Sequence, residues 1–372
     1  MTPTAIFKNR YPVASILWIA ISILACPATE GRPLSLFEGL DLPDSITFCG
    51  ESVPLSDARI RERLEKEMLL ALWDRPQVLL WIKRAPRYFP HIAKVLNTQN
   101  MPDDLKYLAV AESALRPHAG STKGAIGFWQ LLPDTARKYG LTVDPFIDER
   151  RNLFSSTPAA LRYLKELHGK FSSWTLAAAA YNMGEQGLTA EILEQRVKDY
   201  YRLYLPLETQ RFVFRVIAVK LILSEPQRYG FKLSPDKLYK PFVFDNAHVD
   251  CFQEIPLQLV AEAAGSYFKE IKDLNPHLRG HYLRAGHHQI LLPVGRSEGF
   301  QTRLNKLISQ YARDKQKRLY IVKSGDSLST IAEKFDVPLA ALIIWNRIDH
   351  RRPIHPGDRL VIYPRRLDQI KP

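Results

Sequence analysis

The sequence predicts an α+β protein in which a mainly helical domain is followed by small β-α-α-β modules. From residue 57 to about residue 223, apolar residues recur at helical spacing and the intervening loops are short. Beyond residue 240, short apolar stretches typical of strands enclose pairs of short helical segments, and this outline occurs twice. A chain of 372 residues is long enough for several such units, each with its own core.

The N-terminal residues 1–25 are typical of a secretory signal. Lys8 and Arg10 form a basic start, and the 13-residue, mostly apolar run that follows is too short to span a bilayer comfortably. The run ends in Ile-Leu-Ala-Cys, which resembles a bacterial lipobox with Cys26 as the lipidated residue; ordinary secretion or an uncleaved anchor is the alternative. We expect a periplasmic cell-envelope protein, anchored to the outer membrane through Cys26, with residues 26–55 as a tether or a strap.

The formal net charge of +13, or +11 without the signal, favours an anionic partner such as nucleic acid, anionic lipid or an acidic cell-wall polymer. Nucleic acid is not expected, because no basic run is interleaved with aromatic residues. The histidines and cysteines lack metal-ligand spacing, so no metal or other cofactor is predicted. Cys49 and Cys251 are left as an even pair, for which a disulfide is one possibility in an oxidising compartment.

The helical domain is predicted to span residues 56–235. Residues that start or end helices divide this domain into separate helices: serine is typical of a helix start, and proline and glycine are typical of a helix end. The helices are expected at 57–97 with a break at Pro76, 105–116 ended by Pro117, 133–139 closed by Gly140, 157–168, 174–183 and 206–223.

The modules are predicted at 240–295 and 319–364, with a helix or linker at 296–318 between them. The first is expected to place helices at 257–264 and 268–274 between strands at 242–244 and 290–293. The second is expected to place helices at 327–335 and 338–345 between strands at 319–323 and 359–363. The first copy lacks the glycine-aspartate opening of the second, so it is the more degenerate.

A carboxylate lies on an apolar helical stripe. Leu105, Leu108, Glu112 and Leu115 are spaced 3, 4 and 3, which places them on one face of a helix that packs inward. Burial raises the pKa of a Glu, and a raised pKa suits a general acid near neutral pH. The alternative is a structural Glu paired with an Arg or a backbone donor.

Three short motifs place Glu112 in a family context. Ala111-Glu112-Ser113, Gly127-Phe128-Trp129-Gln130 and Ala180-Tyr181-Asn182 occur in the order and approximate spacing of the lytic murein transglycosylase domain, which is related in fold to goose-type lysozyme. Residues 95–225 look most like the membrane-bound type D branch. The segment 319–364 resembles a LysM module, with Gly325-Asp326-Ser327-Leu328 and Trp345-Asn346 in the expected places.

The resemblance implies cleavage of the β-1,4 bond between N-acetylmuramic acid and N-acetylglucosamine, leaving 1,6-anhydromuramyl ends. Glu112 would act as general acid and then as base. A single carboxylate is enough because the sugar's own C6 hydroxyl attacks, whereas hydrolases use two. Two alternative functions stay open. One is a hydrolase of the same fold that uses Asp148 or Glu149, although these two residues could instead form ion pairs with the adjacent arginines. The other is a non-catalytic wall-binding protein.

The resemblance also implies substrate contacts along peptidoglycan glycan strands, while protein partners stay unspecified. Tyr181 and Asn182 have structural alternatives as a core tyrosine and a helix cap, and Phe128 and Trp129 could be core or sugar platforms. Three loop glycines, Gly120, Gly124 and Gly127, are expected to let the backbone approach the glycan. The substrate-binding residues are predicted to be Ser113, Gln130, Tyr181 and Asn182, and the glycan-binding residues of the LysM module Gly325, Asp326, Ser327 and Asn346.

Overall fold

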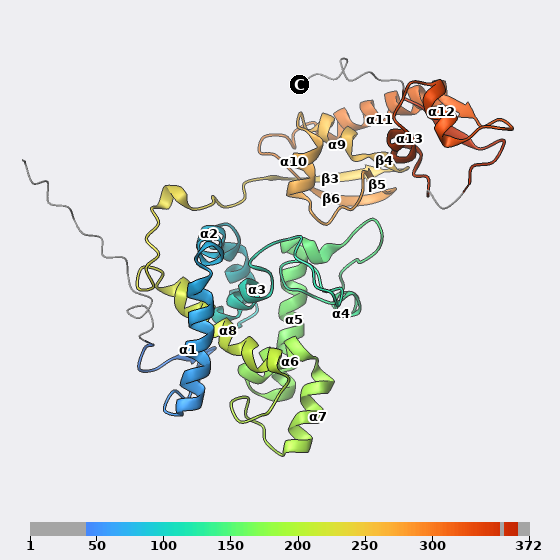
Figure 1. Cartoon of the computed structure of the whole chain (residues 1–372). Helices are drawn as coiled ribbons and strands as arrows, with labels where there is room; N and C mark the ends of the chain where they lie inside the picture. Colours follow the sequence, from blue (N-terminus) through green and yellow to red (C-terminus); the bar gives the residue numbers. More distant parts are fainter. Residues whose placement is uncertain (1–41, 350–352, 364–372) are drawn as a thin grey trace, which may run out of the picture.

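The computed structural model describes residues 42–349 and 353–363, and it contains a helical domain followed by two small modules (Figure 1). The α+β class predicted from the sequence is confirmed. Cys26 and the signal segment lie outside the described residues, so their roles stay predictions. Within the described ranges, none of the helices is both long and apolar enough to cross a membrane.

The helical domain has a single hydrophobic core that extends from Ile46 to Phe231. Eight α-helices and three 3-10 turns build it, and most connections between them are short. The helices are α1 (Ala58–Trp73), α2 (Arg75–Thr98), α3 (Lys106–Ser113), α4 (Pro133–Lys138), α5 (Leu153–Phe171), α6 (Trp174–Met183), α7 (Glu185–Gln195) and α8 (Leu207–Ser224), and the turns are η2 (Asp103–Leu105), η3 (Glu149–Arg151) and η4 (Pro235–Lys237).

Helix α6 is the centre of this domain. Its residues 175–180 are all buried, and α5 and α8 pack against it on either side. Four consecutive alanines allow this, because small side chains let neighbouring helices approach closely. Ser173 caps the start of α6 and Gly184 its end, so the helix has the predicted bounds of 174–183. The polar residues Tyr181 and Asn182 are therefore held in the last turn of a rigid buried helix.

Residues 46–55 pack against the helical domain. This part of the segment predicted to be a tether or a strap is therefore a strap. The short strands β1 (Thr47–Phe48) and β2 (Glu51–Ser52) pair, and Phe48 is fully buried. The Glu51 carboxylate accepts hydrogen bonds from the backbone amides of Trp174 and Thr175. The strap thus supplies an anionic cap to the N-terminus of α6, where the helix dipole favours negative charge.

Several helix boundaries differ from the prediction for local reasons. The break between α1 and α2 falls at Asp74, whose side chain caps α2, so Pro76 lies in the first turn where a missing amide costs little. Helix α5 begins at Leu153 because the Asn152 side chain accepts from two amides, and Pro158 is accommodated inside the helix. Helix α7 is not among the predicted helices.

The first module has its own core and a two-stranded antiparallel sheet. Strand β3 (Asp245–Cys251) pairs with β6 (Gly286–Leu292) along its full length, and short β4 (Ile255–Pro256) pairs with β5 (Tyr282–Leu283). Helices α9 (Leu257–Ala263) and α10 (Phe268–Leu274) lie where predicted. The strand predicted at 242–244 is wrong, because Phe242 and Phe244 pack edge-on against rings of the helical domain instead.

Residues 296–318, for which the sequence allows a helix or a linker, contain helix α11 (Phe300–Lys317). Phe300 and Leu304 are buried in the core of the first module, so α11 completes that module. Cys251 is buried in the same core and Cys49 lies in the helical domain; both are free thiols, so the two do not form a disulfide here.

The second module repeats the outline of the first. Strands β7 (Leu319–Ile321) and β8 (Arg359–Val361) pair antiparallel, with α12 (Leu328–Lys334) and α13 (Leu339–Asn346) between them, close to the predicted ranges. The two modules share one internal device. Asn275 bonds the backbone of Ile271 and Leu291, and Asn346 bonds that of Leu342 and Val361 in the same pattern. Each asparagine therefore ties the end of the second helix to the last strand.

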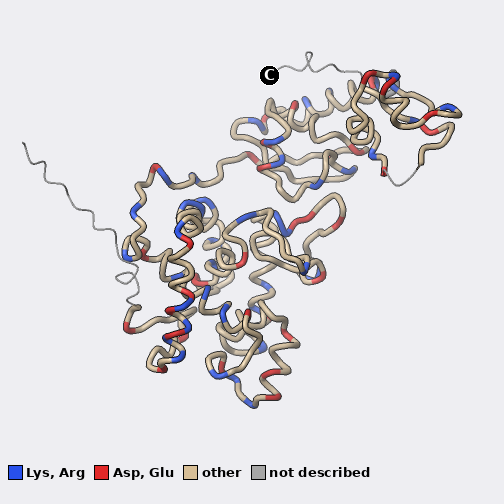
Figure 2. The backbone as a smooth tube through the Cα atoms, viewed as in Figure 1, with Lys and Arg blue, Asp and Glu red and all other residues tan. Residues whose placement is uncertain are grey.

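Lys and Arg are spread over the helical domain and both modules rather than gathered on one element (Figure 2). This distribution differs from the continuous basic stripe that a nucleic-acid-binding surface usually shows.

Candidate active site

Glu112 lies in the last turn of α3, the position predicted for it. The helix ends at Ser113 because Ala114 and Leu115 both adopt left-handed backbone conformations, with φ of 53° and 58°. Such φ values are costly for residues with a side chain, and they redirect the chain immediately after the carboxylate. Arg84 holds this turn by donating to the Ala114 carbonyl over 2.9 Å.

The Glu112 side chain is largely enclosed but keeps some access to solvent. Desolvation raises its pKa to about 8; the Arg215 charge opposes that shift and the Glu208 charge adds to it. Both of these charged groups lie on α8, which packs against α3. The carboxyl is therefore mainly protonated at neutral pH, which is the state that a general acid requires.

Tyr181 is electrostatically close to Glu112. Burial raises the pKa of Tyr181 well above its usual range, and the negative charge of Glu112 raises it further. Its hydroxyl donates to the Trp129 carbonyl over 2.6 Å, so a phenol from α6 holds the loop that carries Gln130. Tyr181 is thus half-buried and bonded, as in the structural alternative, yet it lies beside the candidate acid.

The loop at residues 119–131 covers the end of α3 and is held from both sides. Ser113 is buried, and its hydroxyl lies 2.8 Å from the Phe128 carbonyl and 2.9 Å from the Ala109 carbonyl. Gln130 adopts a positive φ of 48° and donates through Nε2 to the Ala119 and Gly127 carbonyls. In this structure both side chains bond the loop itself, and their predicted contacts with the sugar stay predictions.

Gly127 lies in close contact with the protein's own backbone. Its φ is +88°, and a Cβ at this position would lie 1.8 Å from the Arg150 carbonyl oxygen. This close approach is to the backbone of η3, and the predicted approach of the backbone to a glycan stays a prediction. Arg150 completes the contact, since its Nη1 donates to the carbonyls of Gly124 and Leu131 over 2.9 and 3.0 Å.

Of the remaining motif residues, Phe128 and Trp129 belong to the core and Asn182 does not. Phe128 and Trp129 are buried, and the indole of Trp129 donates to Thr157, so both are core residues. Asn182 is half-buried, and its Oδ1 accepts a hydrogen bond from the Thr209 hydroxyl over 2.8 Å. The sequence indicated Arg150 only as an ion-pair partner of the neighbouring carboxylates, and it did not single out Thr209 or Arg215.

The alternative carboxylates have structural partners. Asp148 is fully buried and makes a two-pronged ion pair with Arg150, at 2.8 and 2.9 Å. Glu149 accepts from the Thr142 amide and from the Ser155 hydroxyl. Neither carboxylate is placed as a free partner for water.

The predicted glycan-binding residues of the second module also serve its fold. Ser327 caps α12 in a capping box with Thr330, and the Asp326 carboxylate accepts from the Tyr320 hydroxyl and the Lys323 amide. Gly325 is exposed with φ of +87°, and Asn346 binds the last strand. Their contacts with glycan stay predictions.

Three family models match consecutive parts of the chain. The Transglycosylase SLT domain matches residues 90–203, and the LysM-like domain of lytic transglycosylase MltD matches residues 246–309. The LysM domain matches residues 320–362. The membrane-bound lytic murein transglycosylase D of Escherichia coli K12 is 32% identical over 324 residues, which covers 83% of this chain and 70% of the relative.

The chain belongs to the lytic murein transglycosylase D family. The same protein from Escherichia coli O6:H1 matches to the same extent. The crystal structure of the 70 kDa soluble lytic transglycosylase of Escherichia coli aligns with a TM-score of 0.36 at 18% identity, over 51% of this chain and 32% of that chain. The family and the enzyme class predicted from the three motifs are confirmed: this is a lytic transglycosylase of peptidoglycan.

Proposed function

We propose that this transglycosylase cleaves the β-1,4 bond between N-acetylmuramic acid and N-acetylglucosamine and leaves 1,6-anhydromuramyl ends. Glu112 donates its proton to the glycosidic oxygen as the bond from C1 to that oxygen breaks. The resulting carboxylate accepts the proton of the C6 hydroxyl while O6 bonds to C1. The proton count balances and no water is consumed, so one group serves both steps.

The raised pKa of Glu112, caused by desolvation, carries this proposal. A carboxyl with an ordinary pKa would be ionised at neutral pH and could not start the reaction as an acid. The Arg215 charge favours the carboxylate that forms transiently, and the Glu208 charge opposes it.

The absence of a free second carboxylate among the motif candidates supports transglycosylation over hydrolysis. A hydrolase needs a second group to activate water or to attack the sugar. The two candidates, Asp148 and Glu149, are engaged with Arg150 and with Thr142 and Ser155. We therefore place the hydrolase alternative second.

The remaining assignments concern location and substrate contact. Ser113, Gln130, Tyr181 and Asn182 contact the substrate, and the second module binds peptidoglycan through the loop that contains Gly325 and through α13. The relative's description as membrane-bound and the sequence around Cys26 support an envelope protein anchored by lipid.

Replacement of Glu112 by Gln tests the assignment of the acid. The amide keeps the shape of the side chain but cannot donate a proton, so the release of soluble fragments from sacculi should fall by a factor on the order of 10² to 10⁴. Binding to sacculi should be unchanged, because Glu112 is remote in sequence from the second module. Undiminished release by Glu112→Gln would contradict the proposal.

A further inference from the structure

The first module is docked on the helical domain through backbone hydrogen bonds. The Asp148 amide donates to the His277 carbonyl over 2.9 Å, and the Arg279 amide donates to the Phe146 carbonyl over 2.7 Å. These bonds flank an antiparallel bridge between Ile147 and Leu278. A segment of the helical domain and a segment of the module thus form one small β-ladder.

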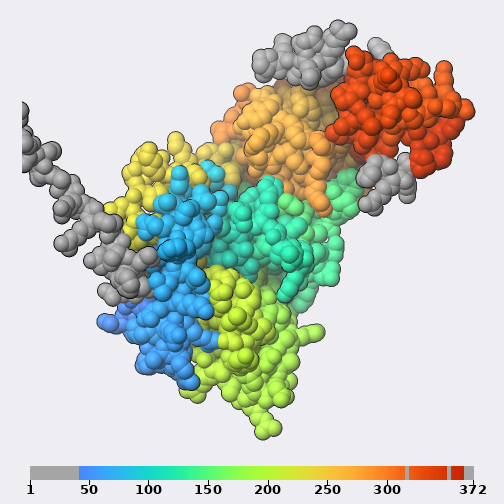
Figure 3. All heavy atoms as spheres, viewed as in Figure 1, coloured from blue at the N-terminus to red at the C-terminus, as the bar shows by residue number. Residues whose placement is uncertain are grey.

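Side chains add to this ladder. The Arg284 guanidinium lies 4.7 Å from the Phe146 ring centroid and 3.7 Å from the Asp144 carboxylate. His277 is buried and its Nδ1 lies 3.2 Å from the Asn152 amide nitrogen, at the cap of α5. In the space-filling view, the module covers the end of the helical domain that carries this segment (Figure 3).

The docked segment is bonded in turn to the active-site loop. Asp148, whose amide bonds the module, holds Arg150 through two ion-pair contacts. Arg150 then bonds the carbonyls of Gly124 and Leu131, on either side of Gln130. The path from His277 to this loop therefore begins with a backbone hydrogen bond to Asp148 and continues through bonds of the Arg150 guanidinium. The latter are charge-assisted, and such bonds are among the stronger polar contacts in proteins.

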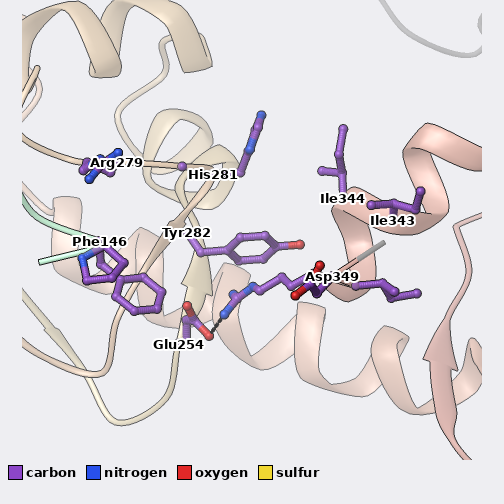
Figure 4. Close-up of a pocket in the computed structure, with 12 residues that line it drawn as sticks. Phe146, Glu254, Arg279, His281, Tyr282, Ile343, Ile344 and Asp349 are labelled. Atoms are coloured by element: carbon purple, nitrogen blue, oxygen red, sulfur yellow. Dashed lines mark hydrogen bonds and ion pairs between the residues drawn. The ribbon is translucent and has the colours of Figure 1, made fainter. Parts of the chain in front are cut away.

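The second module is connected to the same place. Arg347, the residue that follows α13, forms an ion pair with Glu254 and lies 3.7 Å from the Tyr282 ring centroid. Together with Phe146, these residues line a pocket of about 400 Å³ where the three parts of the chain meet (Figure 4).

We propose that the first module is a brace for the active-site loop, and that its docking through residues 277–279 onto residues 146–148 positions the loop at 119–131 for catalysis. The proposal requires the transglycosylase activity but not the assignment of Glu112. In this account the module acts on turnover, whereas a module that only binds glycan would act on substrate affinity.

A disulfide across the ladder tests whether docking occurs in solution. Ile147 and Leu278 form a pair without hydrogen bonds to each other, and such pairs have Cα atoms about 4.5 Å apart, within the range for a disulfide. In the full-length protein, Ile147→Cys with Leu278→Cys should cross-link on mild oxidation, as detected by peptide mapping. The cross-linked enzyme should keep its kcat on soluble, peptide-free glycan strands. Failure to cross-link, or loss of kcat in the cross-linked form, would overturn the proposal.

A charge placed in the ladder tests whether docking positions the loop. Ile147 is half-buried and lies outside the core of the helical domain, so Ile147→Lys should undock the module and lower kcat on soluble glycan strands about fivefold or more, with KM changed by less than about twofold. Thr142→Lys is the matched control, because it adds the same charge at an exposed position of the same segment. The conservative Ile147→Val should retain wild-type kcat.

Arg284→Glu repeats the test from the module side, opposite Asp144, and covers the case in which Ile147→Lys does not fold. It should lower kcat in the same sense with KM preserved. Unchanged kcat in the folded undocking variants, or a change confined to KM, would show that the module does not position the loop.

Discussion

At the scale of the residue, Glu112 combines two conflicting requirements. Its place on an apolar stripe of α3 serves packing, since Leu105 and Leu108 on the same face are fully buried. A carboxylate on that face loses hydration, and the protein lowers this penalty by keeping the group protonated. The same desolvation that opposes folding at high pH would supply the acid in the proposed reaction.

The pH dependence of turnover should reflect the pKa of about 8 for Glu112. Because the protonated form is the acid, kcat/KM for soluble glycan should fall as the pH rises through about 8, with the slope of a single proton. A pH–rate profile that already falls between pH 4 and 6 would mean that Glu112 has an ordinary pKa.

Two variants on α8 provide opposite controls for this profile. Arg215→Gln removes a charge that lowers the pKa of Glu112, so the alkaline limb should move to higher pH. Glu208→Gln removes a charge that raises it, so the limb should move to lower pH. Shifts in the same direction would indicate that another group controls the limb.

Stability should also depend on this residue. A Glu whose folded pKa is raised contributes its full share of stability below pH 4.5, and that share is lost as the pH rises through about 8. Glu112→Gln removes this loss, so the variant should equal wild type near pH 4 and exceed it by up to a few kcal/mol at pH 9. Thermal unfolding at the two pH values measures the difference; a variant less stable than wild type at pH 9 would contradict it.

The sequence predicts the acid but not the whole site. Glu112 can be predicted because helical spacing places a carboxylate on an apolar face, and the motifs add Gln130 and Tyr181. The adjacent carboxylates indicate Arg150 as an ion-pair partner, but its contact with the loop is not indicated by any local pattern. The same holds for the contact of Thr209 with Asn182, which are distant in sequence. The glycines of the loop could be recognised from the sequence as positions of close approach, but the residues that they approach could not be predicted.

At the scale of the element, the loop at residues 119–131 is fixed by its surroundings as well as by its own Gln130. Tyr181 bonds it from α6, Ser113 from α3 and Arg150 from η3. Each of these elements ends or turns close to the loop, so the conformation of the loop depends on the relative positions of the three elements. Its geometry should therefore respond to steric change at the point of closest contact, Gly127.

Gly127→Ala should remove most activity and destabilise the protein by about 3 kcal/mol or more, because the new Cβ would meet the Arg150 carbonyl at 1.8 Å in addition to the strain of φ +88°. Gly124→Ala is the matched control, since its φ of +83° is equally unfavourable but nothing lies within 4 Å of the added atom. Chemical denaturation and turnover assays on both separate the clash from the strain. Equal effects of the two substitutions would contradict the close-contact account.

The elements themselves were predictable where a local signal exists. Ser173 and Gly184 delimit α6, and the second module matches its predicted outline closely, because caps and turns act over a few residues. Errors occur where tertiary contacts decide: Phe242 and Phe244 form no strand because they pack on the helical domain.

At the scale of the whole molecule, the helical domain and the two modules each have a separate hydrophobic core, and polar and aromatic contacts connect the three parts. The modules have their own sheets and cores, and the second contacts the first through Arg347, Glu254 and Tyr282. A glycan-binding module attached to a catalytic domain raises the effective concentration of enzyme on the polymer without taking part in the chemistry.

Removal of residues 318–372 should therefore weaken binding to sacculi by a factor on the order of 10². Turnover of soluble glycan strands should change by less than about twofold, because the second module has its own core and sheet. Co-sedimentation with sacculi and turnover of soluble strands measure the two effects independently. Unchanged sedimentation would contradict a glycan-binding role for the second module.

The central claim is that one carboxyl, Glu112, directs cleavage with the sugar's own hydroxyl as the nucleophile. Mass spectrometry of the fragments released from purified sacculi by the full-length enzyme tests this claim most directly. We predict muropeptides with 1,6-anhydromuramyl ends, each lighter by one water than the corresponding hydrolysis product, and no such fragments with Glu112→Gln. Fragments with only reducing muramic acid ends would contradict the claim and would require a second carboxylate.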